Sequence, residues 1–204
     1  MVAAVGHTDA TYPQVIDAID AGATVGTHVF NGMRPPHHRA PGPAYALLGA
    51  PGVICEFVAD GVHLADDTLR FATGVVGADR AALITDAIDA TGMRDGDYNL
   101  GGQAVVVRDG VARLVTVDGS TGAIAGSTLT MDSAFRRVLS IGVTIVDAAR
   151  MAATNPARAL GLTDRGALAP GLRADLLVLR ADDHSIATVV RGGSPKSQYG
   201  VTSN

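Results

Sequence analysis

Short apolar runs alternate with amphipathic stretches from the start of the chain to about residue 90. The runs are continuously apolar, which is typical of strands buried on both faces of a parallel sheet. They predict strands at the start of the chain and at residues 23–28, 52–59 and 80–85. Apolar residues at helical spacing predict helices over 12–22 and 65–75. Strands and helices in this order predict an α/β fold with a parallel sheet.

The pattern changes after about residue 90. Arg108-Asp109-Gly110, between two apolar runs, predicts a β-hairpin insertion near 98–120, and a loop rich in glycine, serine and threonine follows at 122–128. Two further helices are predicted from Met131 to Leu139 and over 146–153. The end of the chain predicts two more strands, beginning near Leu176 and Ile186, and then a flexible tail over 193–204.

A polar residue suited to chemistry follows each of the first four predicted strands. Three are histidines, namely His7, His28 and His63, and the fourth is Asp86. Catalytic groups of β/α barrels project from the carboxyl ends of the strands, so this layout predicts a metal-dependent hydrolase on such a barrel. A complete barrel needs about 250 residues, whereas this chain has 204. We therefore expect only part of one, over residues 1–160, followed at 161–192 by strands of a smaller domain.

Each of these four residues has more than one interpretation. His7 and His28 are candidate metal ligands because neutral imidazole is the commonest ligand for zinc-like ions, although both could be structural. His63 could bind metal or donate a hydrogen bond to a substrate carbonyl. Asp86 is placed to act as general base and then general acid, and its alternative role is a helix cap or turn, for which Asp89 is the better candidate.

Two loops are further candidates for ligand binding. Arg34, His37, His38 and Arg39 make a cationic loop, and a guanidinium group suits phosphate, although the loop could simply be solvated. The glycine-rich segment at 122–127 could hold a ligand with its main-chain amides.

Composition excludes several classes of function. The net charge is −4, and the absence of a basic run argues against a nucleic-acid partner. No stretch approaches 18 consecutive apolar residues, so no membrane span is predicted. Cys55 is the single cysteine, so a disulfide framework is excluded, and this fits a cytoplasmic location. We interpret Cys55 as a small buried apolar residue.

Seven segments together resemble the N-acetylglucosamine-6-phosphate deacetylase family of the amidohydrolase superfamily, over about residues 1–192. They occur in this order: Gly6-His7-Thr8-Asp9-Ala10-Thr11, Thr27-His28-Val29-Phe30-Asn31-Gly32-Met33, Arg39-Ala40-Pro41-Gly42, Ala59-Asp60-Gly61-Val62-His63, Thr85-Asp86-Ala87, Ala125-Gly126-Ser127-Thr128-Leu129-Thr130-Met131 and Asn155-Pro156-Ala157-Arg158-Ala159-Leu160-Gly161. The resemblance implies the C-terminal half of a (β/α)8 TIM barrel with part of a small β-sandwich domain.

The resemblance also implies the roles of individual residues. His7 and His28 would bind a divalent metal cation, zinc or iron, and Asp86 would accept and donate the proton. The other implied contacts are with a phosphorylated N-acetyl amino sugar. They come from Asn31, Gly32, Arg39, Asp60, His63, Ile124 and Ala125, and in the family Arg39 reaches phosphate in the neighbouring subunit of a homodimer.

The implied reaction is hydrolysis of N-acetylglucosamine 6-phosphate to glucosamine 6-phosphate and acetate. In the family, a glutamate from the first half of the barrel completes the metal site. This chain has one glutamate, Glu56, inside a predicted strand, so we do not assign it as a ligand. We expect a truncated chain that is inactive on its own. Two alternatives are a non-catalytic half-barrel that needs a complementary chain, and a hydrolase of cyclic amides or nucleobases, which has no use for a phosphate-binding Arg39.

Overall fold

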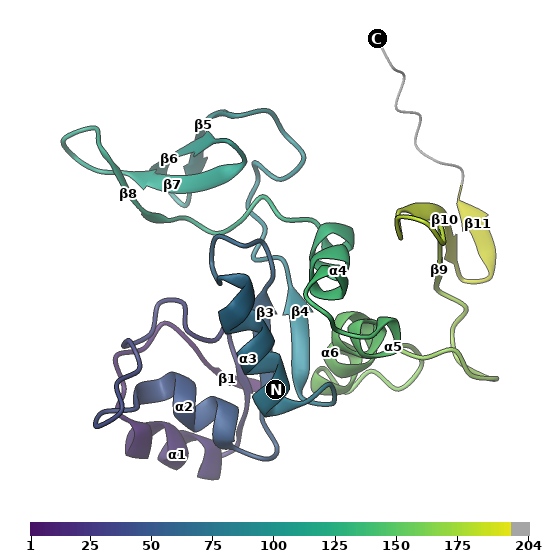
Figure 1. Cartoon of the computed structure of the whole chain (residues 1–204), viewed down its shortest axis with the longest axis horizontal. Coiled ribbons are helices and arrows are strands. Elements are labelled where there is room, and N and C mark those ends of the chain that lie inside the picture. The colour runs from purple at the N-terminus through teal and green to yellow at the C-terminus, as the bar shows by residue number, and fades with distance from the viewer. Residues whose placement is uncertain (197–204) are drawn as a thin grey trace.

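The computed structural model describes residues 1–196, and its centre is a four-stranded parallel sheet with strand order β1-β2-β3-β4 (Figure 1). The strands are β1 (Ala3–Val5), β2 (Ala23–Gly26), β3 (Ile54–Val58) and β4 (Ala81–Ile84). A helix connects each strand to the next, and these are α1 (Tyr12–Asp20), α2 (Gly42–Gly49) and α3 (Asp66–Val76). The predicted order of parallel strands is therefore confirmed, as are the predicted helices α1 and α3, and each strand is shorter than its apolar run.

Helix α1 shows how local sequence fixes an element. The side chain of Gln14 accepts a hydrogen bond from the main-chain N–H of Thr11 at 2.8 Å, and Pro13 lies in the first turn. Val15 is buried on the side of the helix that faces the sheet. The helix ends at Asp20, just before Gly22, whose φ of 109° is disfavoured for residues with a side chain.

Helix α2 was not predicted. Its sequence, Gly-Pro-Ala-Tyr-Ala-Leu-Leu-Gly, is almost entirely apolar, and six of its eight residues are buried. A helix that is apolar on all sides has no hydrophobic periodicity from which it can be recognised. The cationic loop that carries Arg34 and Arg39 therefore ends where α2 begins, at Gly42.

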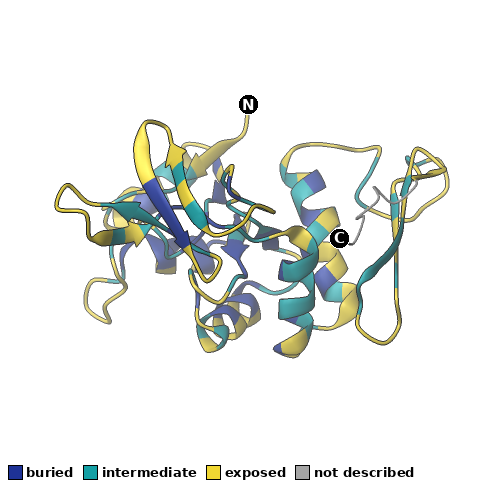
Figure 2. Cartoon of the chain, turned by 90° about the horizontal axis from the view of Figure 1, so that it is seen from above, coloured by how far each residue is buried: buried dark blue, intermediate teal, exposed yellow. Residues whose placement is uncertain are grey.

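The main core lies between the sheet and its helices (Figure 2). Cys55 and Phe57 point from β3 into this core and are fully buried, whereas Ile54 belongs to a smaller cluster on the opposite face, together with Val25 and Ala82. Burial raises the pKa of the Cys55 thiol to about 11, and the thiol donates a hydrogen bond to the Leu47 carbonyl at 3.4 Å. The interpretation of Cys55 as a buried apolar residue is confirmed.

The predicted hairpin belongs to a four-stranded antiparallel sheet, with order β5-β6-β7-β8. Its strands are β5 (Gly96–Leu100), β6 (Gln103–Arg108), β7 (Val111–Val115) and β8 (Thr121–Ile124). Asp109 and Gly110 have φ values of 51° and 72°, as a tight hairpin turn between β6 and β7 requires. The prediction of a loop over 122–128 is wrong in its first part, since β8 pairs with β7. The two outer strands contain residues that are depleted in strands, namely Gly96, Asp97 and Asn99 in β5 and Gly122 and Ala123 in β8, so their sequences give little strand signal.

Helices follow the small sheet and return the chain to β4. They are α4 (Met131–Ser140), α5 (Ile145–Ala149), the π-helix η1 (Arg150–Thr154) and α6 (Asn155–Ala159). Asn155 is 1% exposed and donates hydrogen bonds of 2.6 Å to the carbonyls of Ala78 and Ala81. It thereby fastens the end of the helical segment to the start of β4.

The chain ends in a three-stranded antiparallel sheet of β9 (Leu176–Leu179), β10 (Ile186–Arg191) and β11 (Ser194–Lys196), in the order β11-β10-β9. The two predicted strands are confirmed. The predicted flexible tail over 193–204 is wrong at residues 194–196, which pair with β10, and residues 197–204 lie outside the described part of the chain. The domain division at residue 160 stays a prediction. No helix among residues 1–196 combines the length and the apolar character that a membrane span requires.

Candidate active site

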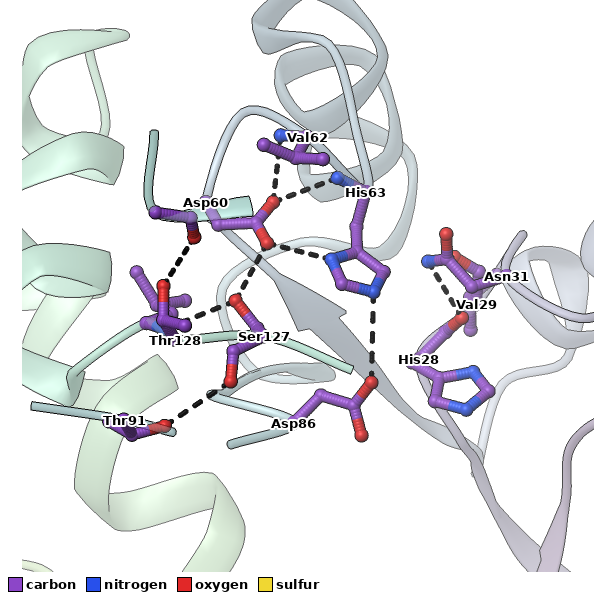
Figure 3. Close-up of polar contacts among 12 residues, drawn as sticks. His28, Val29, Asn31, Asp60, Val62, His63, Asp86, Thr91, Ser127 and Thr128 are labelled. Atoms are coloured by element: carbon purple, nitrogen blue, oxygen red, sulfur yellow. Dashed lines mark hydrogen bonds and ion pairs between the residues drawn. The ribbon is translucent and has the colours of Figure 1, made fainter. Parts of the chain in front are cut away.

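The predicted catalytic residues lie together beyond the carboxyl ends of the parallel strands. His7, His28 and Asp86 each lie two residues after the end of a strand, and His63 comes from the loop after β3. Figure 3 shows His28, His63 and Asp86 in this arrangement. The first three have φ values of 42°, 28° and 51°, in the region that residues with a side chain rarely adopt. Such conformations persist only where the surrounding structure holds them, and they cluster at functional sites.

The two candidate metal ligands face each other. The Nε2 atoms of His7 and His28 lie 2.8 Å apart, and the rings meet edge to face with centroids separated by 4.6 Å. His28 is 5% exposed, and its Nδ1 is buried without a hydrogen-bond partner in the described residues. Two convergent imidazole nitrogens fit a divalent cation of the zinc or iron type. Residues 1–196 contain no group of three or more histidine, cysteine, aspartate or glutamate side chains that could hold a metal ion.

His63 is held by Asp60. One carboxylate oxygen of Asp60, Oδ2, accepts a hydrogen bond from His63 Nδ1 at 2.7 Å, and the other accepts the main-chain N–H groups of Val62 and His63, both at 2.8 Å. Burial acts to raise the pKa of the Asp60 carboxyl. The hydrogen bonds from His63, Val62 and Ser127 outweigh that effect and hold the pKa well below its usual range. An ionised carboxylate can only accept, so Nδ1 of His63 carries the proton.

The opposite nitrogen of His63 faces Asp86. His63 Nε2 lies 3.7 Å from Asp86 Oδ2, and the Asp86 side chain is 36% exposed whereas that of His63 is only 5% exposed. The imidazole therefore lies between two carboxylates (Figure 3). That of Asp60 is 11% exposed and hydrogen-bonded at both oxygens, whereas that of Asp86 is open to an incoming molecule.

Glu56 lies inside β3, close to His28 and Asp86. Burial raises the pKa of its carboxyl, the main-chain N–H of His28 lowers it, and the negative charge of Asp86 raises it, with a net upward shift. Its position within the strand hid this proximity in the sequence. The carboxyl lies beneath the candidate site, where it contacts the main chain of His28.

The turn after β2 brings two predicted substrate contacts against the histidines. The side-chain amide of Asn31 donates to the carbonyls of His28 at 3.2 Å and Val29 at 3.5 Å. Gly32 has a φ of 60°, and a Cβ atom built on it would lie 2.7 Å from His7 Nδ1. The missing side chain of Gly32 therefore makes room for the His7 ring.

The two arginines of the cationic loop differ in their partners. Arg34 makes a two-pronged ion pair with Asp9, with both N–O distances 2.8 Å. Arg39 is exposed, and its guanidinium lies 2.6 Å from His38 Nε2. Within residues 1–196, Arg39 has no carboxylate partner and makes no hydrogen bond with His7, His28, His63 or Asp86, so its assignment to phosphate stays a prediction.

Ile124 and Ala125 lie at the end of the small antiparallel sheet. Ile124 is the last residue of β8, and Ala125 is 4% exposed and belongs to the core of that sheet. Their assignment to the sugar site stays a prediction, as does that of Asp60 to substrate contact. The same loop carries Ser127, which sequence reasoning missed as a site residue although it noted the motif around it. Its hydroxyl donates to Asp60 Oδ2 at 2.8 Å.

A parallel β/α sheet with a histidine pair, a further histidine and an aspartate beyond its strand ends is an arrangement typical of metal-dependent hydrolases of the β/α-barrel class. Residues 1–196 match the model of the amidohydrolase family, and the chain belongs to that family.

The names of individual relatives specify a reaction more closely than the family model does. The chain is 40% identical over 185 residues to an N-acetylglucosamine-6-phosphate deacetylase of Lysinibacillus sphaericus, covering 90% of this chain and 46% of the relative. It is 40% identical over 181 residues to an N-acetylgalactosamine-6-phosphate deacetylase of Escherichia coli O157:H7, covering 88% and 46%.

A solved structure extends the similarity to the fold. It is that of a mutant N-acetyl-D-glucosamine-6-phosphate deacetylase from Mycobacterium smegmatis in complex with N-acetyl-D-glucosamine-6-phosphate. The two share 50% sequence identity with a TM-score of 0.89, over 96% of this chain and 51% of that one. The chain thus spans about half the length of these relatives and corresponds to half of their fold.

Proposed function

We propose that this chain supplies the metal-binding histidines and the proton-transfer aspartate of an N-acetylglucosamine-6-phosphate deacetylase site. The observation that carries the proposal is the meeting of four residues from four loops, with His7 and His28 facing each other and His63 facing Asp86. The names of the relatives support the choice of reaction and substrate.

His7 and His28 would hold the divalent cation through their Nε2 atoms. When bound, such a cation lowers the pKa of water toward neutrality and polarises a carbonyl group. Because catalytic sites of this kind normally have three protein ligands, a further ligand would have to come from outside the described residues. In this proposal, that ligand belongs to the half of the relatives' barrel that this chain does not cover.

Asp86 would accept the proton of the water that attacks the acetamide carbon and then deliver it to the departing amine nitrogen. Its partial exposure lets both water and substrate reach its carboxylate. The Nε2 atom of His63 borders the same space. In the doubly protonated ring this nitrogen carries an N–H group, which would stabilise negative charge on the acetamide oxygen. Asp60 would keep that ring fixed during the reaction.

The phosphate of the sugar would be bound by Arg39, the arginine of its loop that is not already paired with Asp9. Asn31, Gly32, Ile124 and Ala125 would contact the sugar. The exposed position of Arg39 is compatible with its reaching the site of a neighbouring subunit in a homodimer, which forms part of this proposal.

The test is release of acetate from N-acetylglucosamine 6-phosphate with zinc or iron supplied and metal content measured in the same sample. The chain is assayed alone and together with the half of the Mycobacterium smegmatis relative that it does not cover. We expect turnover in the assembled pair and none from the chain alone. A metal-loaded, assembled pair that releases no acetate would contradict the proposal. The N-acetylgalactosamine epimer is assayed in parallel, because one relative is named for it.

A further inference from the structure

Ser127 is buried and makes contacts with both sides of the His63–Asp86 pair. Its hydroxyl donates to Asp60 Oδ2 at 2.8 Å (Figure 3), and its main-chain N–H donates to the Asp86 carbonyl at 2.7 Å. Asp60 lies 67 positions earlier in the chain. One residue of the loop after β8 therefore ties together the loops that follow β3 and β4.

The direction of the Ser127 hydroxyl is fixed by its own neighbours. The main-chain N–H of Leu129 donates to Ser127 Oγ at 3.1 Å, which occupies a lone pair and leaves the hydroxyl proton for Asp60. Oδ2 of Asp60 is thus held by two donors, Ser127 and His63. A buried carboxylate that keeps its charge needs such donors, because burial alone favours its neutral form.

The main chain of Ser127 is equally constrained. Its carbonyl accepts the N–H of Ile88 at 3.0 Å and the hydroxyl of Thr91 at 3.2 Å. The preceding residue, Gly126, has a φ of 66°, and a Cβ atom built there would lie 2.9 Å from the carbonyl oxygen of Asp86. The loop therefore packs against the main chain of Asp86 with no space for a side chain between them.

We propose that Ser127 is a positioning residue that sets the relative placement of His63 and Asp86. It acts on His63 through the carboxylate of Asp60 and on Asp86 through the main chain. The inference rests on the proposed function only in that His63 and Asp86 act on the substrate. The positioning itself is a property of the chain and can be measured without turnover.

The test compares four forms of the full chain, namely the wild type, Ser127→Ala, Ser127→Thr and Thr128→Val. Ser127→Thr keeps the hydroxyl. Thr128→Val is the matched control, because Thr128 is the next residue and its hydroxyl donates to the Gly110 carbonyl rather than to a carboxylate. Two quantities are followed by nuclear magnetic resonance, namely the titration of the Asp60 carboxyl carbon and the exchange rate of the His63 Nδ1 proton.

We expect Ser127→Ala to raise the pKa of Asp60 by about one unit, a tenfold change in its acid dissociation constant. The His63 Nδ1 proton should then exchange about tenfold faster, since its acceptor is held less firmly. Ser127→Thr and Thr128→Val should stay close to the wild type. Unchanged values in Ser127→Ala, or equal changes in Thr128→Val, would overturn the proposal.

Two further experiments cover a variant that does not fold and a wild type that shows no turnover. If Ser127→Ala does not fold, Ser127→Cys keeps nearly the same volume with a weaker donor, and a shift of the Asp60 pKa in the same direction is expected. In the acetate assay, Ser127→Ala should lower kcat about tenfold with KM within twofold, and Ser127→Thr should restore kcat. A wild type without turnover would count against the proposed function, while the resonance measurements would still decide the role of Ser127.

Discussion

The Nε2 atoms of His7 and His28 lie 2.8 Å apart, although the two residues are separated by 21 positions and follow different strands. Both sit in the left-handed region of backbone conformation, two residues after β1 and β2. Neighbouring parallel strands end at the same edge of the sheet, so equivalent positions after each strand are brought together. The pairing is therefore a consequence of the β/α repeat.

The first prediction concerns metal binding. We expect His7→Asn to lower the affinity of the chain for zinc by more than about tenfold, because it removes one of two convergent nitrogens. His37→Asn is the matched control, since His37 is an exposed histidine of the cationic loop. Competition titration with a zinc chelator measures both. Equal affinities for His7→Asn and the wild type would show that His7 is not a ligand.

The second prediction concerns the space beside His7. A Cβ atom on Gly32 would lie 2.7 Å from His7 Nδ1, so Gly32→Ala should displace the ring and weaken zinc binding. Gly101→Ala is the control, because Gly101 has a φ of 58°, close to the 60° of Gly32, but nothing within 4 Å of its Cβ position. Gly101→Ala should cost only the backbone strain of about 1 kcal/mol and leave zinc binding unchanged. Equal zinc affinities in the two variants would contradict the steric argument.

The third prediction concerns pH. The pKa of Asp60 lies well below its value in the unfolded chain, so its ionised carboxylate stabilises the fold at neutral pH. That contribution is fully present above the unfolded pKa, near 4, and is lost as pH falls from there through the lowered pKa. Asp60→Asn should reduce the free energy of unfolding by about 2 kcal/mol at pH 7, and by less at pH 3.

Urea unfolding at the two pH values measures the effect of Asp60→Asn. Asp67→Asn is the control, because the Asp67 side chain is 93% exposed and its ion pair with Arg70 lies at the surface. It should change stability little at either pH. A pH-independent difference between Asp60→Asn and the wild type would show that the charge of Asp60 has no part in its stabilising effect.

The fourth prediction concerns phosphate. Arg39→Ala should weaken binding of N-acetylglucosamine 6-phosphate by about 10- to 100-fold and change binding of the unphosphorylated sugar little, since only the former offers an anion to a guanidinium. Arg34→Ala should have the smaller effect on the phosphorylated sugar, because Arg34 is already paired with Asp9. Calorimetry with both sugars measures the difference. Equal losses for the two sugars would favour a hydrolase of neutral cyclic substrates.

Sequence patterns predicted the helices and strands that have a distinct hydrophobic pattern and missed those that lack such a pattern. The continuous apolar runs marked β1 to β4, and the amphipathic spacing marked α1 and α3. Helix α2 was missed because it is apolar on all sides. The outer strands β5 and β8 were missed because glycine, alanine, aspartate and asparagine, which are depleted in strands, make up half or more of each.

The residues of the candidate site were also predictable to different degrees. His7, His28 and Asp86 were predictable because each directly follows a recognisable strand. The hydrogen bonds that hold Asp60 were only partly predictable. Its bond to His63 joins neighbours in the sequence, whereas its bond to Ser127 spans 67 positions and depends on how the loop after β8 folds back. Sequence patterns report local periodicity and carry no information on such a long-range contact.

Under the proposed function, Asp86 carries the proton in an amide hydrolysis, so its replacement is the decisive experiment. In the assembled, metal-loaded protein, Asp86→Asn should lower kcat for acetate release from N-acetylglucosamine 6-phosphate by about 100- to 10,000-fold with metal content unchanged. Asp89→Asn, three residues further along in an exposed position, should keep wild-type turnover. Wild-type turnover in Asp86→Asn would show that Asp86 does not transfer the proton.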